Sequence, residues 1–237
     1  MKKNLNKFLD KLIAHRGMHN KYISENSLLA LEKAIFKNIP VEIDVVLTKD
    51  KIVILSHDKY FKYKNKIINI TTTDYSTLHN YTKKIVTLKQ VLNFINGRIP
   101  ILIELKPYNK GNKLEKNIVK ILDNYNGIFA IQSFNPSTIN WFKNNRKKYI
   151  CGQLITGNNR YNFIYNFFYK ILFFNKFTKA DFICYNVNGF PNKNVEKLRK
   201  KIPIIGWTIK SKEQLSKYKS YCDNFICDNI EKIMEDL

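Results

Sequence analysis

The sequence predicts an α/β fold, a closed barrel of eight parallel strands in one domain, and three observations support it. The chain has 237 residues, a size at which such barrels commonly form a single unit. Short apolar runs alternate with amphipathic helical patterns, which is typical of repeated β-α-β units. Polar side chains stand at the ends of several apolar runs, as they would around one barrel mouth. We therefore predict a single-domain TIM (β/α)8 barrel over residues 1–237.

Eight apolar runs are predicted as the barrel strands. In chain order they are Leu12–Ala14, Val41–Leu47, Ile101–Leu105, Phe129–Ser133, Cys151–Ile155, Phe182–Tyr185, Ile204–Ile209 and Asn224–Cys227. Helical patterns fall between most of them. These are Ser27–Lys37, Leu88–Ile95, Leu114–Asn124, Pro136–Asn144, Asn194–Lys200 and Lys212–Tyr218.

One further apolar run, Ile52–Ser56, follows the second strand after only four residues. A parallel crossover needs about a dozen residues or more, so this run must turn back antiparallel as a hairpin strand outside the ring. It delivers His57 and Asp58 to the strand end, and residues 59–86 form a short insertion. A doubly wound open sheet is the competing fold, but it would spread the polar strand ends along a line.

The net charge of +22 suggests anionic partners. The lysines are scattered along the chain, and Lys, Asn, Ile, Tyr and Phe share A/T-rich codons, so base composition explains much of the basicity. We expect no specific nucleic-acid binding, although a basic surface attracts anionic substrates or anionic lipid surfaces.

The cysteines and the N-terminus indicate a reducing compartment. Cys151, Cys184, Cys222 and Cys227 form no C-x-x-C pair, and three of them lie in apolar runs. We expect buried, reduced thiols. The apolar stretch near the N-terminus is too short for a signal-peptide core, and no run reaches membrane-spanning length without polar interruptions. A cytoplasmic protein is the expectation.

Two predicted strands carry carboxylates on one face. Glu42 and Asp44 lie two residues apart in an otherwise apolar run, so both side chains point the same way. Glu104 and Lys106 repeat this spacing at the end of the next barrel strand. Buried carboxylates repel each other unless a cation pairs them. Three anionic oxygens favour Mg²⁺ or Ca²⁺ over zinc, and an Arg or Lys partner is the alternative.

Further polar groups stand at the other strand ends. His15 and His57 can transfer protons at neutral pH, and Arg16 and Lys106 can hold a phosphate. Glu25 is expected to support its loop.

The remaining motif residues have more ordinary interpretations. Asn26 is expected to cap the first long helix. His79 is expected at the surface, and His19 is a weak candidate for a loop role. Phe134 and Trp207 follow or end later strands, where aromatic residues either pack or line a pocket for a glycerol or alcohol group.

The ordered set of motifs resembles the glycerophosphodiester phosphodiesterase family. The motifs are His15-Arg16-Gly17, Glu25-Asn26, Glu42-x-Asp44, His57-Asp58, Glu104-x-Lys106, Ser133-Phe134 and Trp207-Thr208. The resemblance extends from about Ile13 to Asp228. It departs from the family pattern at Asn26-Ser27 and at Cys227-Asp228, and the short segment after His57-Asp58 leaves little room for a large capping domain.

The resemblance implies a role for each main site residue. Glu42, Asp44 and Glu104 would bind one divalent cation. His15 and His57 would be the general acid/base pair, with His15 as base and His57 as acid. The phosphate would be held by Arg16 and Lys106.

The expected activity is metal-dependent hydrolysis of glycerophosphodiesters to glycerol 3-phosphate and an alcohol. One alternative is a phospholipase C- or D-type reaction on intact or lyso lipids, with weak peripheral membrane contact through the aromatic-rich residues 161–177. A second is a non-catalytic binder of glycerophosphodiesters. The sequence predicts neither the alcohol moiety nor the oligomeric state.

Overall fold

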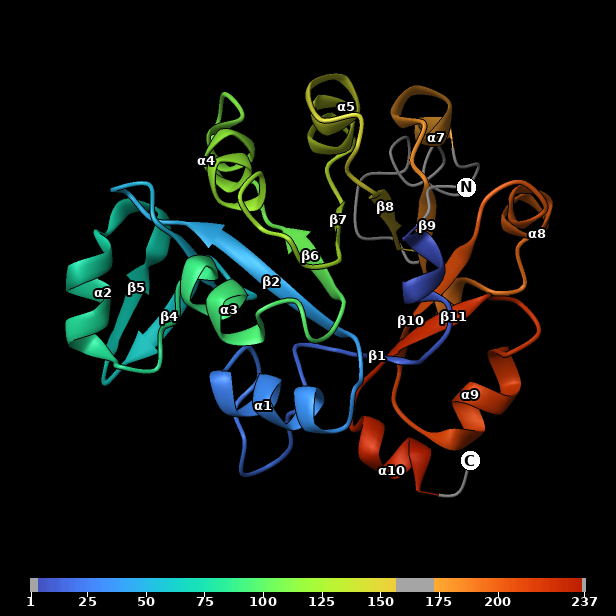
Figure 1. Cartoon of the computed structure of the whole chain (residues 1–237), viewed down its shortest axis with the longest axis horizontal. Helices are drawn as coiled ribbons and strands as arrows, with labels where there is room; N and C mark the ends of the chain where they lie inside the picture. The colour runs from blue at the N-terminus through green and yellow to red at the C-terminus, as the bar shows by residue number, and fades with distance from the viewer. Residues whose placement is uncertain (1–3, 157–172, 236–237) are drawn as a thin grey trace.

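The protein forms a closed barrel of eight parallel strands, seen in a computed structural model that describes residues 4–156 and 173–235 (Figure 1). In order around the barrel the strands are β1 (Ile13–Ala14), β2 (Val41–Leu47), β6 (Ile101–Leu105), β7 (Phe129–Ser133), β8 (Cys151–Ile155), β9 (Phe182–Asn186), β10 (Ile204–Ile209) and β11 (Asn224–Cys227). Ala14 pairs with Val41 on one side and with Cys227 on the other, which closes the ring. The predicted TIM barrel is confirmed, and each predicted barrel strand matches an observed one within one residue at either end.

Helices surround the barrel (Figure 1). They are α1 (Leu28–Phe36), α3 (Leu88–Ile95), α4 (Lys113–Leu122), α5 (Pro136–Asn145), α7 (Phe173–Thr178), α8 (Lys193–Arg199), α9 (Lys212–Tyr218) and α10 (Ile230–Met234). Side-chain caps start several of them. Thr87 and Gln90 form a reciprocal capping box at α3, and the Ser211 hydroxyl accepts a hydrogen bond from the backbone of Gln214 at α9.

Side chains alternate between the two faces of each strand, so those of the ring pack either inside the barrel or outside it against the helices. The odd-numbered residues of β2 and β6 pack outward against the helices, in one large apolar cluster. Within the ring, the even-numbered residues of these strands face the barrel interior, where Leu102 joins Ile13, Phe182, Ile205 and Ile226, whereas Val46 lies beyond the ring beside β3. The short 3-10 helix η1 (Leu5–Phe8) adds Leu5 and Phe8 to this interior cluster.

The predicted hairpin strand lies outside the ring. Strand β3 (Val53–Leu55) pairs antiparallel with β2, with Val45 opposite Leu55. The following segment forms a two-stranded antiparallel sheet of β4 (Tyr60–Tyr63) and β5 (Lys66–Asn69), then η2 (Ile70–Thr72) and α2 (Tyr75–Tyr81). Ile70 and Leu78 pack against Val46 and Ile54, which anchors this segment to the side of the barrel (Figure 1).

Asn26 differs from its predicted role. The cap of α1 is Ser27, whose side chain accepts a hydrogen bond from Ala30, while Asn26 has a φ of +51°. Its amide instead donates to Asp44 Oδ2 at 3.1 Å, and its carbonyl oxygen accepts from the Asp44 backbone at 3.2 Å. The prediction of an Asn26 cap is therefore wrong, because long-range bonds to β2 hold this residue outside the helix.

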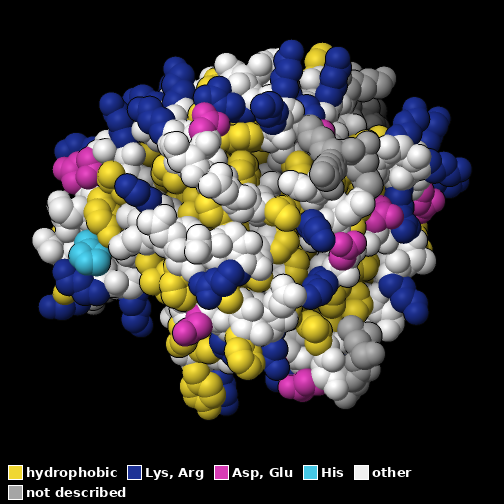
Figure 2. Space-filling model, viewed as in Figure 1, with side chains coloured by type: hydrophobic (Ala, Val, Ile, Leu, Met, Phe, Trp, Pro, Cys, Tyr) yellow, Lys and Arg dark blue, Asp and Glu magenta, His cyan; other side chains and the backbone are white. Residues whose placement is uncertain are grey.

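Other sequence expectations concern the thiols and the surface. All four cysteines are free and buried, as predicted. Lys and Arg side chains are spread over the face shown in Figure 2 and do not form one patch there. Within residues 4–156 and 173–235, no helix is long and apolar enough to cross a membrane. Most of the segment proposed for membrane contact, residues 161–172, lies outside the described residues.

Candidate active site

Three buried carboxylates meet inside the barrel, two of them on β2 and one near the C-terminal end of β6. Asp44 pairs directly with Glu104 across the two strands, and Glu42 lies two residues before Asp44 on the same inward face. Glu42 and Asp44 are each 1% exposed and Glu104 is 7% exposed. One oxygen of each carboxylate lies within 4.8 Å of the others, so the structure brings the predicted carboxylate trio together.

Burial and mutual repulsion dominate the electrostatics of this trio. Burial raises the pKa of Glu42 well above its usual value, and the charges of Asp44 and Glu104 raise it further. Burial likewise raises the pKa of Glu104, to about 7. Burial would raise the pKa of Asp44 too, but Lys106 and Arg16 outweigh it and lower that pKa below its usual value.

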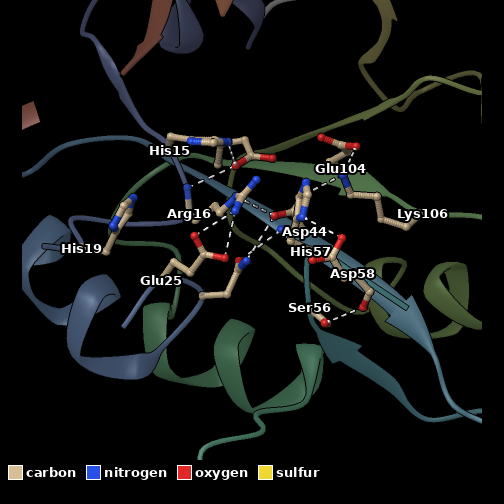
Figure 3. Close-up of polar contacts among 12 residues, drawn as sticks. His15, Arg16, His19, Glu25, Asp44, Ser56, His57, Asp58, Glu104 and Lys106 are labelled. Carbon is tan, nitrogen blue, oxygen red and sulfur yellow. Dashed lines mark hydrogen bonds and ion pairs between the residues drawn. The ribbon is translucent and has the colours of Figure 1, made fainter. Parts of the chain in front are cut away.

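Two cations lie beside the trio (Figure 3). The Lys106 ammonium lies 2.5 Å from Glu104 Oε1 and 3.1 Å from Asp44 Oδ1. Arg16 Nε lies 3.2 Å from Asp44 Oδ2, and one terminal nitrogen of Arg16 donates to both oxygens of Glu25 at 2.8 Å. Burial would lower the pKa of Lys106, but Glu104 and Asp44 together raise it, so this side chain stays charged.

The donor set suits a hard divalent cation. Four carboxylates, those of Glu25, Glu42, Asp44 and Glu104, surround two cations, Arg16 and Lys106, so this cluster of six side chains has a formal charge of −2 when all of them are ionised. Glu42 Oε1 is buried and has no hydrogen-bond partner among the described residues. An all-oxygen set with an unpaired buried anion matches the ligand preference of Mg²⁺ and Ca²⁺. Lys and Arg partners are also present, as the alternative interpretation of the carboxylates predicted.

A tight turn after β1 carries the predicted His-Arg-Gly residues. Arg16 has a φ of +54° and Gly17 a φ of +79°, and a Cβ on Gly17 would lie 3.0 Å from the Cβ of Ala30. The turn directs the backbone N–H of Arg16 to Glu42 Oε2 at 3.2 Å. It also places His15 Nε2 4.0 Å from the same oxygen.

The second histidine reaches the site from the hairpin. The backbone N–H of Ser56 donates to the Asp44 carbonyl at 3.1 Å, which fixes the end of β3 beside β2. His57 follows, and its Nδ1 lies 3.1 Å from Asp58 Oδ1. Burial lowers the pKa of His57, and the nearby charge of Lys106 lowers it further, so the neutral imidazole is favoured.

A pocket of about 310 Å³ opens over the carboxylates. Every predicted site residue except Asp44 lines it, including Phe134 and Trp207, whose rings meet edge to face at 5.5 Å. Asp44 lies against Arg16, Lys106 and Asn26. The pocket also has lining residues that sequence analysis did not assign to the site. These are His19, Gln132, Leu154, Thr208, Lys210, Ile226 and Asp228, together with the loop residue Glu25.

Two of the pocket residues that sequence analysis missed, Gln132 and Asp228, are marked by different features of the sequence. Gln132 pairs with Glu104 across β6 and β7, so strand register alone would have placed it facing inward. Asp228 directly follows the last barrel strand, the position that also carries His15 after the first.

Comparison with known proteins places this site in a family context. The model of the glycerophosphoryl diester phosphodiesterase family matches residues 15–232. A candidate glycerophosphodiester phosphodiesterase of Bacillus subtilis is 26% identical over 154 residues, which cover 56% of this chain and 60% of the relative. The chain spans about half the length of the curated relatives it matches.

Solved structures share the fold over nearly the whole chain. A glycerophosphodiester phosphodiesterase from Thermotoga maritima is 27% identical with a TM-score of 0.77, covering 95% of this chain and 97% of that one. A phosphodiesterase from Oleispira antarctica, solved with the product sn-glycerol-3-phosphate, is 21% identical with a TM-score of 0.80, covering 97% of each chain.

Proposed function

The chain belongs to the glycerophosphoryl diester phosphodiesterase family, and from this premise we propose that it hydrolyses glycerophosphodiesters to glycerol 3-phosphate and an alcohol. The observation that carries the proposal is one pocket beside the buried carboxylate trio, whose lining includes His15, His57, Arg16 and Lys106. These groups come from β2 and from the ends of β1, β3 and β6, the three strands that pair with β2.

The carboxylates of Glu42, Asp44 and Glu104 are the proposed ligands of one Mg²⁺ or Ca²⁺. A divalent cation bound there supplies a Lewis acid that polarises the phosphate. Arg16 and Lys106 hold the phosphate oxygens by charge-assisted hydrogen bonds, since both cations line the pocket.

The two histidines supply proton transfer. His15 accepts a proton at Nε2, the ring nitrogen that faces Glu42, from the nucleophile, which is either water or the glycerol hydroxyl of the substrate. His57 would donate a proton to the leaving alkoxide from its protonated form, which its lowered pKa makes a stronger acid. The two imidazoles follow different strands, β1 and β3, and both line the pocket.

The rest of the pocket suits a small polyol. Gln132 Oε1 and Trp207 Nε1 are buried without hydrogen-bond partners among the described residues, so they offer one acceptor and one donor to glycerol hydroxyls. Phe134, Leu154 and Ile226 form an apolar wall that can contact carbon atoms of glycerol or of the alcohol. The glycerol phosphate bound to the Oleispira antarctica relative supports this substrate class.

A substrate panel tests the proposal. The protein with Mg²⁺ or Ca²⁺ is offered glycerophosphocholine, glycerophosphoethanolamine, glycerophosphoglycerol and lysophospholipids, and the released products are measured. We expect turnover of one or more water-soluble diesters and little turnover of lysophospholipids. Preference for the lysophospholipids would favour a phospholipase-type reaction, and binding without turnover would favour a non-catalytic binder.

A further inference from the structure

His15 is held by a carboxylate from the opposite end of the chain. Its Nδ1 lies 2.5 Å from Asp228 Oδ1, across 213 residues of sequence. Barrel closure creates this contact. Ala14, the last residue of β1, pairs with Cys227, the last residue of β11, and His15 and Asp228 are the residues that directly follow them. The backbone N–H of His15 donates to the Cys227 carbonyl at 3.0 Å. Both ends of the contact are therefore fixed by main-chain pairing.

This contact determines which ring nitrogen carries the proton. A carboxylate at Nδ1 accepts an N–H bond, so a neutral ring keeps its proton there and leaves Nε2 unprotonated. Nε2 is the atom 4.0 Å from Glu42 Oε2, on the side of the carboxylate trio. We propose that Asp228 is a positioning residue that fixes the orientation and tautomer of His15, an inference that rests on the proposed function for its catalytic consequence.

His19 gives Asp228 a second partner. His19 Nε2 lies 3.7 Å from the same oxygen, Asp228 Oδ1, and the backbone N–H of His19 donates to the Gly17 carbonyl at 2.9 Å. Burial would raise the pKa of Asp228, but its hydrogen bond with His15 and the neighbouring His19 imidazole lower it below the usual value. The carboxylate is thus an anion held between two imidazoles, with a fixed direction toward His15.

The other histidine has a much more open partner. Asp58, which contacts His57 Nδ1, has a side chain that is 73% exposed, whereas the side chain of Asp228 is 20% exposed. Solvent weakens an exposed contact of this kind. The two imidazoles therefore differ, and the tightly oriented one is His15, the proposed base.

The test substitutes Asp228→Asn, which keeps the shape and removes the charge. The Asn amide can donate to Nδ1 and so stabilise the tautomer with its proton on Nε2. Nitrogen-15 NMR of the full-length protein without substrate, at a pH where His15 is neutral, should show the proton on Nδ1 in the unsubstituted protein and a shift toward Nε2 in the variant. An unchanged tautomer would overturn the proposal, and this readout does not depend on turnover.

Kinetics with a glycerophosphodiester that the unsubstituted protein cleaves provide the second readout. Asp228→Asn should lower kcat by about 10²–10⁴-fold with little change in KM. In a His15→Ala background the same change should cost much less, because there is no imidazole left to orient. The matched control Glu231→Gln makes the same chemical change three residues later, at an ion pair with Lys33, and should leave kcat unchanged. Equal losses with and without His15 would reduce Asp228 to a structural role and refute the inference.

Discussion

Glu42→Gln should stabilise the protein without metal and destabilise it relative to the unsubstituted protein with metal. In the metal-free protein Glu42 is 1% exposed and faces Asp44 and Glu104, which together with burial raise its pKa. The unfolded chain ionises this carboxyl group freely and the folded protein does not, so replacing it with a neutral amide should increase the free energy of unfolding by about 1–2 kcal/mol. For a chain of this size each kcal/mol shifts Tm by about 2–4 °C, so Tm should rise by about 2–8 °C in chelator.

With metal bound, the unsubstituted protein should be more stable than the Glu42→Gln variant. A divalent cation at about 100 times its Kd stabilises a folded protein by about 2.7 kcal/mol, or about 5–11 °C here. Glu42→Gln removes one of the three proposed ligands and should lose most of that gain. Thermal unfolding with chelator and with excess Mg²⁺ or Ca²⁺ measures both effects.

A matched buried carboxylate provides the control. Glu115 is 2% exposed and accepts a hydrogen bond from Thr138 at 2.6 Å, away from the pocket. Glu115→Gln should leave the metal-induced rise in Tm unchanged. The reasoning is refuted if Glu42→Gln lowers Tm in chelator and retains the full metal-induced rise.

Further predictions concern pH, the histidines and charge. The pKa of Glu104 is raised from 4.5 to about 7, so the folded metal-free protein binds a proton that the unfolded chain has released between these values. Its stability should therefore fall as pH rises through that window. Because metal must displace this proton, the metal-induced rise in Tm should be larger at about pH 8 than at about pH 5.5, and equal rises would contradict this. His15→Ala and His57→Ala should each lower kcat by about 10²–10⁴-fold, whereas His79→Ala on α2 should not; near-normal rates in both single variants would exclude the histidine mechanism. Duplex DNA should bind weakly, with steep loss on adding salt, and a tight sequence-specific complex at physiological salt would contradict the compositional origin of the +22 charge.

The barrel and most of its site could be predicted because they follow from local patterns. The apolar runs of β2 and β6 are fully buried, and period two separates their outward apolar residues from Glu42, Asp44 and Glu104. The hairpin strand β3 followed from the short connection after β2, which a parallel crossover could not span. The metal, the roles of the site residues and the single-domain boundary remain predictions.

The short elements α2, α10, β4 and β5 were not predicted, because their local sequence patterns are weak. Helix α2 buries only Leu78, and α10 has five residues, so neither produces a long amphipathic repeat. Strands β4 and β5 have no fully buried residue and therefore no apolar run.

Long-range contacts account for the remaining differences. Asn26 was assigned by local capping preference, but its amide is used by Asp44, 18 residues away. Asp228 contacts His15 only because the barrel closes, and no spacing within either motif reveals that pairing. Such contacts depend on strand order around the barrel, which local sequence patterns do not contain.

The most direct test of the central claim is phosphorus-31 NMR of metal-stripped protein mixed with a glycerophosphodiester from the panel. We expect no product in chelator. After Mg²⁺ or Ca²⁺ is added in excess, the diester signal should be replaced by that of glycerol 3-phosphate, with an equal amount of free alcohol. Full turnover before metal is added, or no turnover of any glycerophosphodiester afterwards, would contradict metal-dependent hydrolysis at the carboxylate trio.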